Sequence, residues 1–306
     1  MKKAPSNLPE SVRQRLLDLA RQNKQDFGLL LTKYALERLL YRISVSKHRD
    51  TFVLKGALLF QLWTSEPYRP TRDLDMLGYG DESAERYRKI FTDLCSLNVE
   101  DDGLTFLPDT IRVQRIRDEE EYEGVRVLLA SRLTNARIPL QIDIGFGDVV
   151  TPAPMELDYP TLLSFPAPKL HAYPKESVVA EKFEAMVKLG MANSRMKDFY
   201  DLWVMARHFE FKGQVLSAAI KATFERRKTT LPSSKPLALT AEFSEAATKQ
   251  AQWRGFLRKS GLNASESLGE VVKVLDGFLM PVVEGIISNR TLGHTWRPGG
   301  RWKSPS

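Results

Sequence analysis

The spacing of apolar residues divides the chain into a helical start, a mixed middle and a long helical end. Near the N-terminus apolar residues recur every three or four positions, which predicts helices at 8–24 and 26–45. Another helix is predicted at 84–97. From Ser177 onward the same periodicity predicts helices at 177–191, 194–209, 213–228, 240–260 and 266–288.

Strand patterns fill the middle of the chain. Polar and apolar residues alternate at 73–77, 109–117, 124–133 and 138–148, and this period of two is typical of half-buried strands. The stretch 52–63 is almost wholly apolar, and Gly56 interrupts it. That break favours a strand, or a turn that leads into a helix.

Together these elements predict an α+β fold. Residues 1–150 are expected to hold N-terminal helices and a core built on a mixed sheet flanked by helices, and 151–288 a mostly helical domain. The boundary is expected within 151–174, where six prolines predict an extended connector. Glycine, proline and basic-aromatic residues in 289–306 predict a flexible basic tail.

Composition excludes several classes of protein. With 42% hydrophobic and 27% charged residues, the chain is not disordered as a whole. Cys95 is its one cysteine, which excludes a disulfide framework and a zinc site built on several thiolates. The N-terminus lacks the apolar region of a secretory signal, and no run of about 18 apolar residues occurs. We therefore expect a soluble cytoplasmic protein with no membrane partner.

The positive charge is concentrated at the C-terminal end. The net charge is +7, yet residues 1–200 hold 29 basic and 29 acidic side chains. Residues 201–306 hold 16 basic against 9 acidic side chains. Such a basic region suits a surface that attracts phosphates, and a solvated face that keeps the protein soluble is the alternative.

The sharpest chemical feature is Asp73-Leu74-Asp75. Residues i and i+2 of a strand share a face, with Cα atoms about 6.6 Å apart. Two carboxylates so placed suit divalent cations, and oxygen ligands of this kind suit Mg²⁺ bound together with substrate phosphates. The alternative is the polar outer face of an edge strand.

Two further segments add to this motif. Asp143 lies between apolar residues on a second predicted strand, where a buried charge needs a positive partner such as a metal ion. The alternative is an aspartate at a strand end that faces water. Upstream, Gly56 follows Lys55, and a glycine there lets backbone N–H groups approach a phosphate. Its alternative is a glycine required for packing.

Lys182 lies in the middle of an apolar stripe on the helix predicted at 177–191. Val178 and Met186, one turn before and one turn after it, lie on the same face of that helix. An ammonium group there needs a partner. It reaches an anionic ligand such as a phosphate, pairs with a buried carboxylate, or extends to the surface.

Asp198 opens the next helix and shares a face with Asp201 and Leu202. It is a candidate to accept a proton from an attacking hydroxyl or to orient Lys182. A first-turn acid favoured by the helix dipole is the alternative.

Five segments in this order resemble the AbiEii/AbiGii toxin family, nucleotidyltransferase-like proteins of the DNA polymerase β-type superfamily. They are LKGALLFQLW, RPTRDLDM, QIDIGFGD, VVAEKFEAM and SRMKDFYDLW, and they span about residues 50–205. The family usually has two consecutive glycines and then a small hydroxyl residue, where this chain has Gly56-Ala57-Leu58. The resemblance implies a polymerase β-like nucleotidyltransferase core followed by a helical C-terminal half that completes the active site.

The resemblance also implies roles for individual residues. Asp73 and Asp75 would hold Mg²⁺, and Asp143 takes the place of the superfamily's third carboxylate. Asp198 would be the catalytic acidic residue, and Lys182 would contact the nucleotide phosphates. The residues placed beside the nucleoside triphosphate are Lys55, Gly56, Ala57, Arg72, Lys182 and Lys197.

Proteins similar to this act as toxins in toxin–antitoxin or phage-defence systems, and some add nucleotides to the 3′ end of tRNA. The expected partners are thus an NTP, a tRNA acceptor and an antitoxin encoded nearby. The basic residues expected to hold RNA are Arg226, Arg227, Lys228, Arg254, Arg258 and Lys259. Trp253 and Phe256 either stack on bases or belong to the core.

Other functions stay open on the sequence alone. A transferase acting on a protein or small-molecule hydroxyl uses the same chemistry without an RNA surface. A binding module on a degenerate nucleotidyltransferase fold needs no carboxylate set, and a phosphohydrolase uses the same metal site.

Overall fold

A computed structural model describes residues 7–63, 69–118, 122–262, 266–290 and 292–304. The chain forms two compact units. Unit 1 comprises Met1–Gly147 and Met155–Ala172, and unit 2 comprises Asp148–Pro154 and Tyr173–Ser306. The chain therefore passes between the units three times, all within or next to the proline-rich segment.

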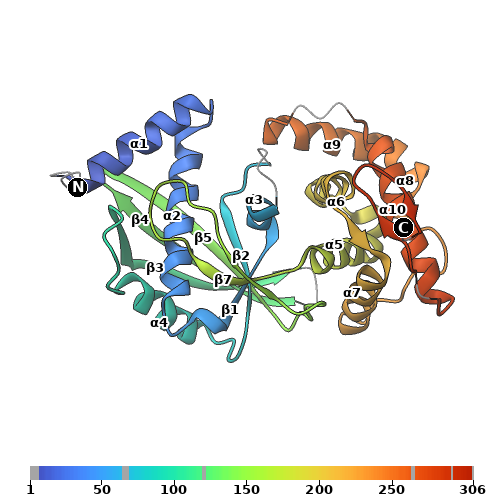
Figure 1. Ribbon diagram of the computed structural model, residues 1–306, viewed down its shortest axis with the longest axis horizontal. Coiled ribbons are helices and arrows are strands. Elements are labelled where there is room, and N and C mark those ends of the chain that lie inside the picture. The colour runs from blue at the N-terminus through green and yellow to red at the C-terminus, as the bar shows by residue number, and fades with distance from the viewer. Residues whose placement is uncertain (1–6, 64–68, 119–121, 263–265, 291, 305–306) are drawn as a thin grey trace. The chain divides into compact units, whose positions relative to one another are not determined.

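Unit 1 is built on a mixed seven-stranded sheet (Figure 1). Its strands are β1 (Phe52–Lys55), β2 (Asp73–Gly78), β3 (Leu104–Asp118), β4 (Tyr122–Leu133), β5 (Ala136–Phe146), β6 (Met155–Asp158) and β7 (Lys169–Ala172). They lie in the order β3-β4-β5-β2-β1-β7-β6. β2 runs parallel to β5 and β1 parallel to β7, whereas the other neighbours are antiparallel. The fold is thus α+β.

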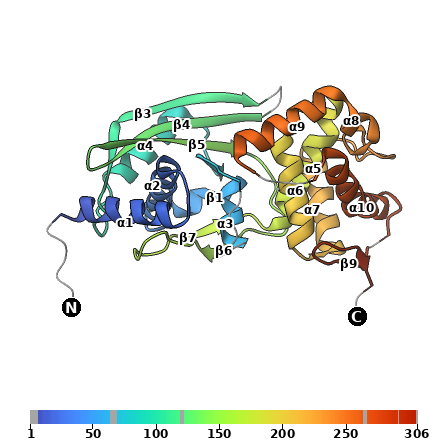
Figure 2. The same cartoon turned by 90° about the horizontal axis from the view of Figure 1, so that it is seen from above.

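Helices cover one side of this sheet. They are α1 (Leu8–Gln22), α2 (Phe27–Ser44) and α4 (Ala84–Cys95), with the short η1 (Arg49–Thr51), η2 (Gly56–Leu59) and α3 (Phe60–Trp63) beside β1. Asn7, Asp26 and Ser83 cap the three long helices by accepting hydrogen bonds from their first turns. Figure 2 shows α1 and α2 on one side of the long strands β3, β4 and β5.

Strand periodicity separates the two faces of the sheet. Ile142, Ile144 and Phe146 of β5 are buried, and the Phe146 ring lies 5.6 Å from that of Tyr87 on α4. The alternate residues Gln141 and Asp143 are partly exposed. One face therefore packs into the core, while the other carries polar side chains.

A buried ion-pair cluster anchors α2 to the rest of unit 1. Arg38 and Arg42 both donate to the carboxylate of Asp102, and Arg38 also lies 3.3 Å from Glu37. Glu37 is 2% exposed and accepts a 2.7 Å hydrogen bond from the backbone N–H of Leu162. Burial raises the pKa of Glu37 to about 7, although the Leu162 and Arg38 contacts oppose the shift.

This raised pKa predicts a pH-dependent stability. An unfolded Glu titrates near pH 4.3, so between about pH 4.5 and 7 the folded protein binds more protons, and stability falls as pH rises. The contribution lost across this window is about 3 kcal/mol. In urea unfolding from pH 5 to 8, Glu37→Gln is expected to flatten this slope. An unchanged slope would show that Glu37 is ionised throughout.

Unit 2 is mostly helical. Its helices are α5 (Lys175–Leu189), η3 (Gly190–Ala192), α6 (Met196–His208), α7 (Gly213–Arg226), η4 (Leu237–Leu239), α8 (Ala241–Glu245), α9 (Ala247–Ser260) and α10 (Leu268–Ile287). The helix predicted at 240–260 is divided, because Ala246 has a non-helical backbone, with ψ 127°, between α8 and α9. Ring contacts pack the helices, such as Phe183 of α5 with Phe224 of α7 at 5.5 Å.

The C-terminal segment differs from the predicted flexible tail. β9 (Thr295–Trp296) pairs with β8 (Phe211–Lys212) and with β10 (Trp302–Lys303). Trp296 is 3% exposed and donates its indole N–H to the carbonyl of Ala206, and the Trp302 ring stacks on Phe278. The tail expectation is therefore corrected: the buried indole ring of Trp296 and the partly exposed ring of Trp302, stacked on Phe278, hold the segment against unit 2.

Candidate active site

Four charged side chains form one row across unit 1. The strand register pairs Lys55 of β1 with Asp75 of β2, Asp75 with Asp143 of β5, and Asp143 with Arg126 of β4. Asp73 lies two residues from Asp75 on the same face, opposite Gln141. Because the opposite face is packed in the core, these side chains gather on the polar face. A cation thus lies at each end of a row of carboxylates.

Gly56 allows Asp75 to take its place in this row. Gly56 follows β1 with φ +76°, a left-handed conformation that favours glycine. A Cβ at this position would lie 2.7 Å from both Cβ and Cγ of Asp75 and would overlap Oδ2. The sequence leaves two roles open for Gly56, close approach of the backbone to a phosphate and packing. In the structure the glycine packs directly against the Asp75 carboxylate.

Gly56→Ala is therefore expected to displace the Asp75 carboxylate. Because a shift of about 1 Å at a reacting centre costs about 100-fold, the nucleotidyl transfer that the resemblance implies should fall by at least that factor. Gly299→Ala is the matched control, since Gly299 also has positive φ, +65°, but a Cβ there meets its nearest neighbour at 3.8 Å. Equal losses of activity in the two variants would show that backbone strain alone is responsible.

Asp73 and Asp75 offer the oxygen ligands that Mg²⁺ prefers, so this pair fits a divalent cation. Asp143 differs, because both of its oxygens accept hydrogen bonds from Arg126, at 2.7 and 2.8 Å, and Gln141 donates a third at 3.0 Å. Within the described ranges, no group of three His, Cys, Asp or Glu side chains is arranged to hold a metal ion. The expected set of Asp73, Asp75 and Asp143 is therefore not found as a three-carboxylate cluster.

A second charged cluster lies in unit 2. Lys182 of α5 places its ammonium 2.5 Å from Asp198 and 2.9 Å from Asp201, both on α6. Arg195 donates to the other Asp198 oxygen at 2.8 Å. The two aspartates are at most 1% exposed. Lys182 thus lies in the apolar stripe as predicted, and of the three partners considered for it, the structure shows buried carboxylates.

The charges around Asp198 decide its protonation. Burial would raise the pKa of Asp198, but Lys182 and Arg195 outweigh burial and hold it below its ordinary value. Asp198 is therefore ionised at neutral pH. A carboxylate with a lowered pKa is a weak proton acceptor, so this geometry favours the alternative in which Asp198 orients Lys182.

Comparison with known families identifies the chain. Residues 38–274 match the family described as nucleotidyl transferase AbiEii toxin, type IV toxin–antitoxin system. The chain belongs to the AbiEii nucleotidyltransferase toxin family. This match confirms the resemblance found in the sequence. The family is one of nucleotidyltransferases that are toxins of toxin–antitoxin systems. A search of curated proteins finds no match.

The fold of this AbiEii protein is shared by solved structures from Helicobacter pylori. JHP933 is 13% identical, with a TM-score of 0.51, over 85% of this chain and 94% of that chain. A candidate nucleotidyltransferase is also 13% identical, with a TM-score of 0.50, over 85% of this chain and 97% of that chain. These likenesses show the nucleotidyltransferase-like fold.

Three other predicted nucleotide-binding residues take no part in the ion pairs described for the two clusters. Ala57 is buried in η2, 6% exposed. Arg72 is 70% exposed and lies 3.9 Å from Asp26. Lys197 is exposed next to Asp198, on another side of α6. The structure therefore joins Lys55, Gly56, Asp73, Asp75 and Asp143 in unit 1, and Lys182 and Asp198 in unit 2.

The residues predicted to hold RNA fall into two groups, one engaged in ion pairs within the fold and one exposed. Arg227 is 14% exposed and forms ion pairs with Asp148, Glu181 and Glu184, which ties the segment 148–154 to unit 2. It is committed to the fold, which corrects its expected role. Arg254, Arg258 and Lys259 of α9 are exposed.

Trp253 and Phe256 were expected either to stack on bases or to belong to the core. Trp253 is a core residue, and Phe256 is only partly buried. Trp253 is 3% exposed and donates its indole N–H to the carbonyl of Glu266. Phe256 is partly exposed and packs 5.7 Å from Tyr200.

No helix in the described ranges has the length and apolar character to cross a membrane.

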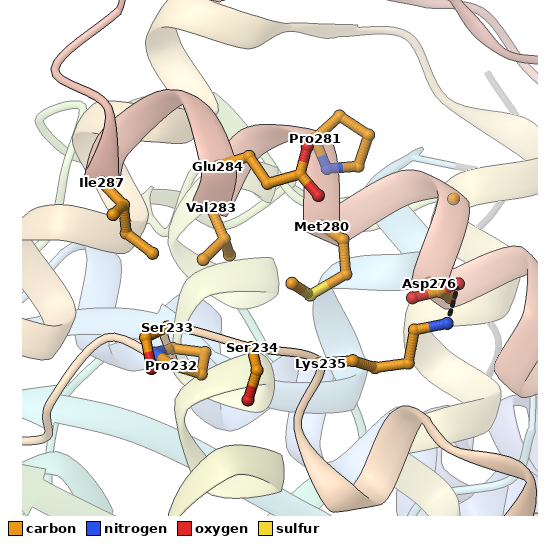
Figure 3. Close-up of a pocket in the computed structure, with 11 residues that line it drawn as sticks. Pro232, Ser233, Ser234, Lys235, Asp276, Met280, Pro281, Val283, Glu284 and Ile287 are labelled. Atoms are coloured by element: carbon orange, nitrogen blue, oxygen red, sulfur yellow. Dashed lines mark hydrogen bonds and ion pairs between the residues drawn. The ribbon is translucent and has the colours of Figure 1, made fainter.

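A pocket of about 390 Å³ lies elsewhere in unit 2, between α10 and the segment 232–235 (Figure 3). Met280 and Val283 point into it, and an ion pair of 2.7 Å between Lys235 and Asp276 closes one end. None of its lining residues is a predicted site residue. We therefore place the candidate site at the charged clusters.

Arg126 is the site residue that sequence reasoning missed. It lies in the segment 124–133, whose alternation predicts a strand, and on the partly exposed face of that strand. Its position on a neighbouring strand, and not any local motif, brings it to Asp143.

Proposed function

We propose that this protein transfers a nucleoside monophosphate from an NTP, with Mg²⁺, to an RNA acceptor, the 3′ end of tRNA, and thereby blocks translation. The observation that carries the proposal is the Asp73–Asp75 pair on the polar face of unit 1, with Gly56 packed against Asp75. Membership in a nucleotidyltransferase toxin family supports it.

The unit 1 residues have complementary roles in this reaction. Asp73 and Asp75 would hold the divalent cation, which when bound supplies charge neutralisation at the phosphates. Lys55 lies beside Asp75 and brings positive charge to the same face. Gly56 leaves room for the Asp75 carboxylate, which a side chain at this position would displace.

In unit 2 the ammonium group of Lys182 is the candidate to neutralise negative charge on a phosphate. Asp198 and Asp201 hold that ammonium from two sides. We therefore give Asp198 a positioning role in the reaction.

For the acceptor, we assign the exposed residues Arg254, Arg258 and Lys259 to the RNA backbone. Contacts of this type release counterions, so binding should weaken steeply with salt. As a member of a toxin family, the protein is expected to be opposed by an antitoxin encoded nearby.

An incorporation assay tests the proposal. The purified chain and Mg²⁺ are incubated with each α-³²P-labelled NTP in turn, with total tRNA and, in parallel, with total protein. Asp75→Asn is the inactive control. Label on tRNA with one NTP, absent from the control, is the expected result and identifies the donor.

The other outcomes separate the alternatives. Label on protein would replace the RNA acceptor by a protein hydroxyl. Toxicity in cells that survives Asp75→Asn would support a non-catalytic binding module. Release of inorganic phosphate without incorporation would indicate a phosphohydrolase.

A further inference from the structure

The third carboxylate of the unit 1 row is engaged by an arginine. Asp143 Oδ1 accepts from Arg126 Nε at 2.7 Å, and Oδ2 accepts from Arg126 Nη2 at 2.8 Å. Gln141 Nε2 donates to Oδ2 as well, at 3.0 Å. This two-pronged geometry is the strong and directional form of an arginine–carboxylate pair. Asp143 is thus occupied on both oxygens.

The opposite edge of the Arg126 guanidinium is available. Two of its nitrogens, Nε and Nη2, donate to Asp143, and Nη1 makes no hydrogen bond to any residue in the described ranges. The side chain is 35% exposed. Hydrogen bonding to Asp143 raises the pKa of Arg126, and the charges of Asp143, Asp73 and Asp75 raise it further. A permanently charged donor therefore lies within electrostatic range of the Asp73–Asp75 pair.

We propose that Asp143 is a positioning residue that holds Arg126, and that Arg126 binds the phosphate chain of the nucleotide held at Asp73 and Asp75. The inference rests on the proposed function and extends it to a new phosphate-binding residue. A triphosphate carries several negative charges, and Lys55 and Arg126 provide a cation at each end of the carboxylate row. Arginine suits such a ligand because its planar fork binds two acceptors at once.

A purely structural ion pair is the rival explanation. It predicts that loss of Arg126 changes stability and leaves phosphate affinity unaltered. A metal-binding Asp143 is the other rival, and it predicts that Asp143→Asn lowers metal affinity as strongly as Asp75→Asn. Phosphate affinity and metal affinity, measured separately, therefore distinguish all three roles.

The experiment uses the full chain and two simple probes. Mn²⁺ affinity is measured by electron paramagnetic resonance of the free ion. Affinity for inorganic tripolyphosphate with Mn²⁺ is measured by calorimetry, which makes the result independent of the nucleobase and of turnover. The variants are Arg126→Gln, Arg126→Lys, Asp143→Asn, the double variant Arg126→Gln/Asp143→Asn, and Asp75→Asn.

Arg132→Gln is the matched control. Arg132 lies on the same strand and the same face as Arg126, exposed and about 20 Å along β4. Thermal unfolding of every variant identifies any that fails to fold. If Arg126→Gln fails to fold, Arg126→Lys, which keeps the positive charge, still tests the role of the guanidinium.

We expect Arg126→Gln and Asp143→Asn each to weaken tripolyphosphate binding about tenfold and to change Mn²⁺ affinity less than about threefold. The double variant should be no weaker than Arg126→Gln, because Asp143 acts through Arg126. Arg126→Lys should be intermediate, and Arg132→Gln should match the unaltered chain. Asp75→Asn should lower Mn²⁺ affinity more than tenfold.

Two results would overturn the inference. Unaltered tripolyphosphate affinity in folded Arg126→Gln would leave the ion pair purely structural. A loss of Mn²⁺ affinity in Asp143→Asn equal to that in Asp75→Asn would make Asp143 a metal ligand. An unaltered chain that binds neither probe would instead overturn the proposed function itself, so the two failures are distinguishable.

Discussion

Asp75→Asn is expected to lower the rate of nucleotidyl transfer by about 10³-fold under the proposed function. Asp75 lies at the centre of the charged row, next to Asp73 and paired in register with Asp143. Removing one carboxylate of a metal-binding pair takes away several kcal/mol of charge stabilisation at the phosphates, and about 4 kcal/mol corresponds to 10³-fold. The rate of label incorporation into the acceptor RNA measures the effect.

Asp158→Asn is the matched control for this change. Asp158 is an exposed aspartate on β6, an edge strand of the same sheet. It should retain full activity, and thermal unfolding should show that both variants fold. Residual activity of Asp75→Asn above about a tenth of the unaltered rate would exclude Asp75 from the reacting centre.

Lys182→Met is expected to lower the free energy of unfolding by about 3–5 kcal/mol at neutral pH. Lys182 is the ammonium that Asp198 and Asp201 share, and both carboxylates are at most 1% exposed. Without it, two buried negative charges lie close together with less compensation. Urea unfolding at pH 7 measures the change. Lys188→Met is the control, since Lys188 lies on the same helix and is exposed.

The pH dependence tests the physical cause. The pKa of Asp198 is lowered in the folded protein, so its stabilising contribution is present above about pH 4 and is lost as pH falls further. In Lys182→Met, Asp198 takes up a proton more readily, so the difference from the unaltered chain should shrink toward pH 4. The double variant Lys182→Met/Asp201→Asn should recover part of the loss at pH 7. No recovery in either experiment would assign the loss to packing of the lysine stem.

Local patterns determined much of unit 1 and of the helices. The Asp73–Leu77 alternation predicted β2, because a strand places every second residue on one face regardless of what lies beside it. The apolar stripe around Lys182 predicted that its ammonium lies among buried residues, since a helix repeats every 3.6 residues. The break at Gly56 favoured a strand, or a turn that leads into a helix, and the structure has a strand followed by a helical turn. In each case the backbone geometry of one element is enough.

Local sequence patterns did not predict that two proline- and glycine-containing segments pack against distant parts of the fold. The segment 155–172 returns to unit 1 because β7 pairs with β1, a contact between Ala172 and Leu54. Trp296 and Trp302 hold the last segment through Ala206 and Phe278. Prolines and glycines in these segments indicated loops, but burial against distant residues overrode that local tendency.

The sequence by itself determined which residues are candidates for the chemistry: a carboxylate pair on a strand, a glycine before it and a lysine in an apolar stripe. Only the tertiary structure decided their partners. It placed Arg126 on Asp143 through the register of β4 and β5, and it placed Asp201 on Lys182 through the packing of α5 and α6. The physical reason is that periodicity along one element depends on local backbone geometry. The partner of a charge depends instead on which distant element is packed against it.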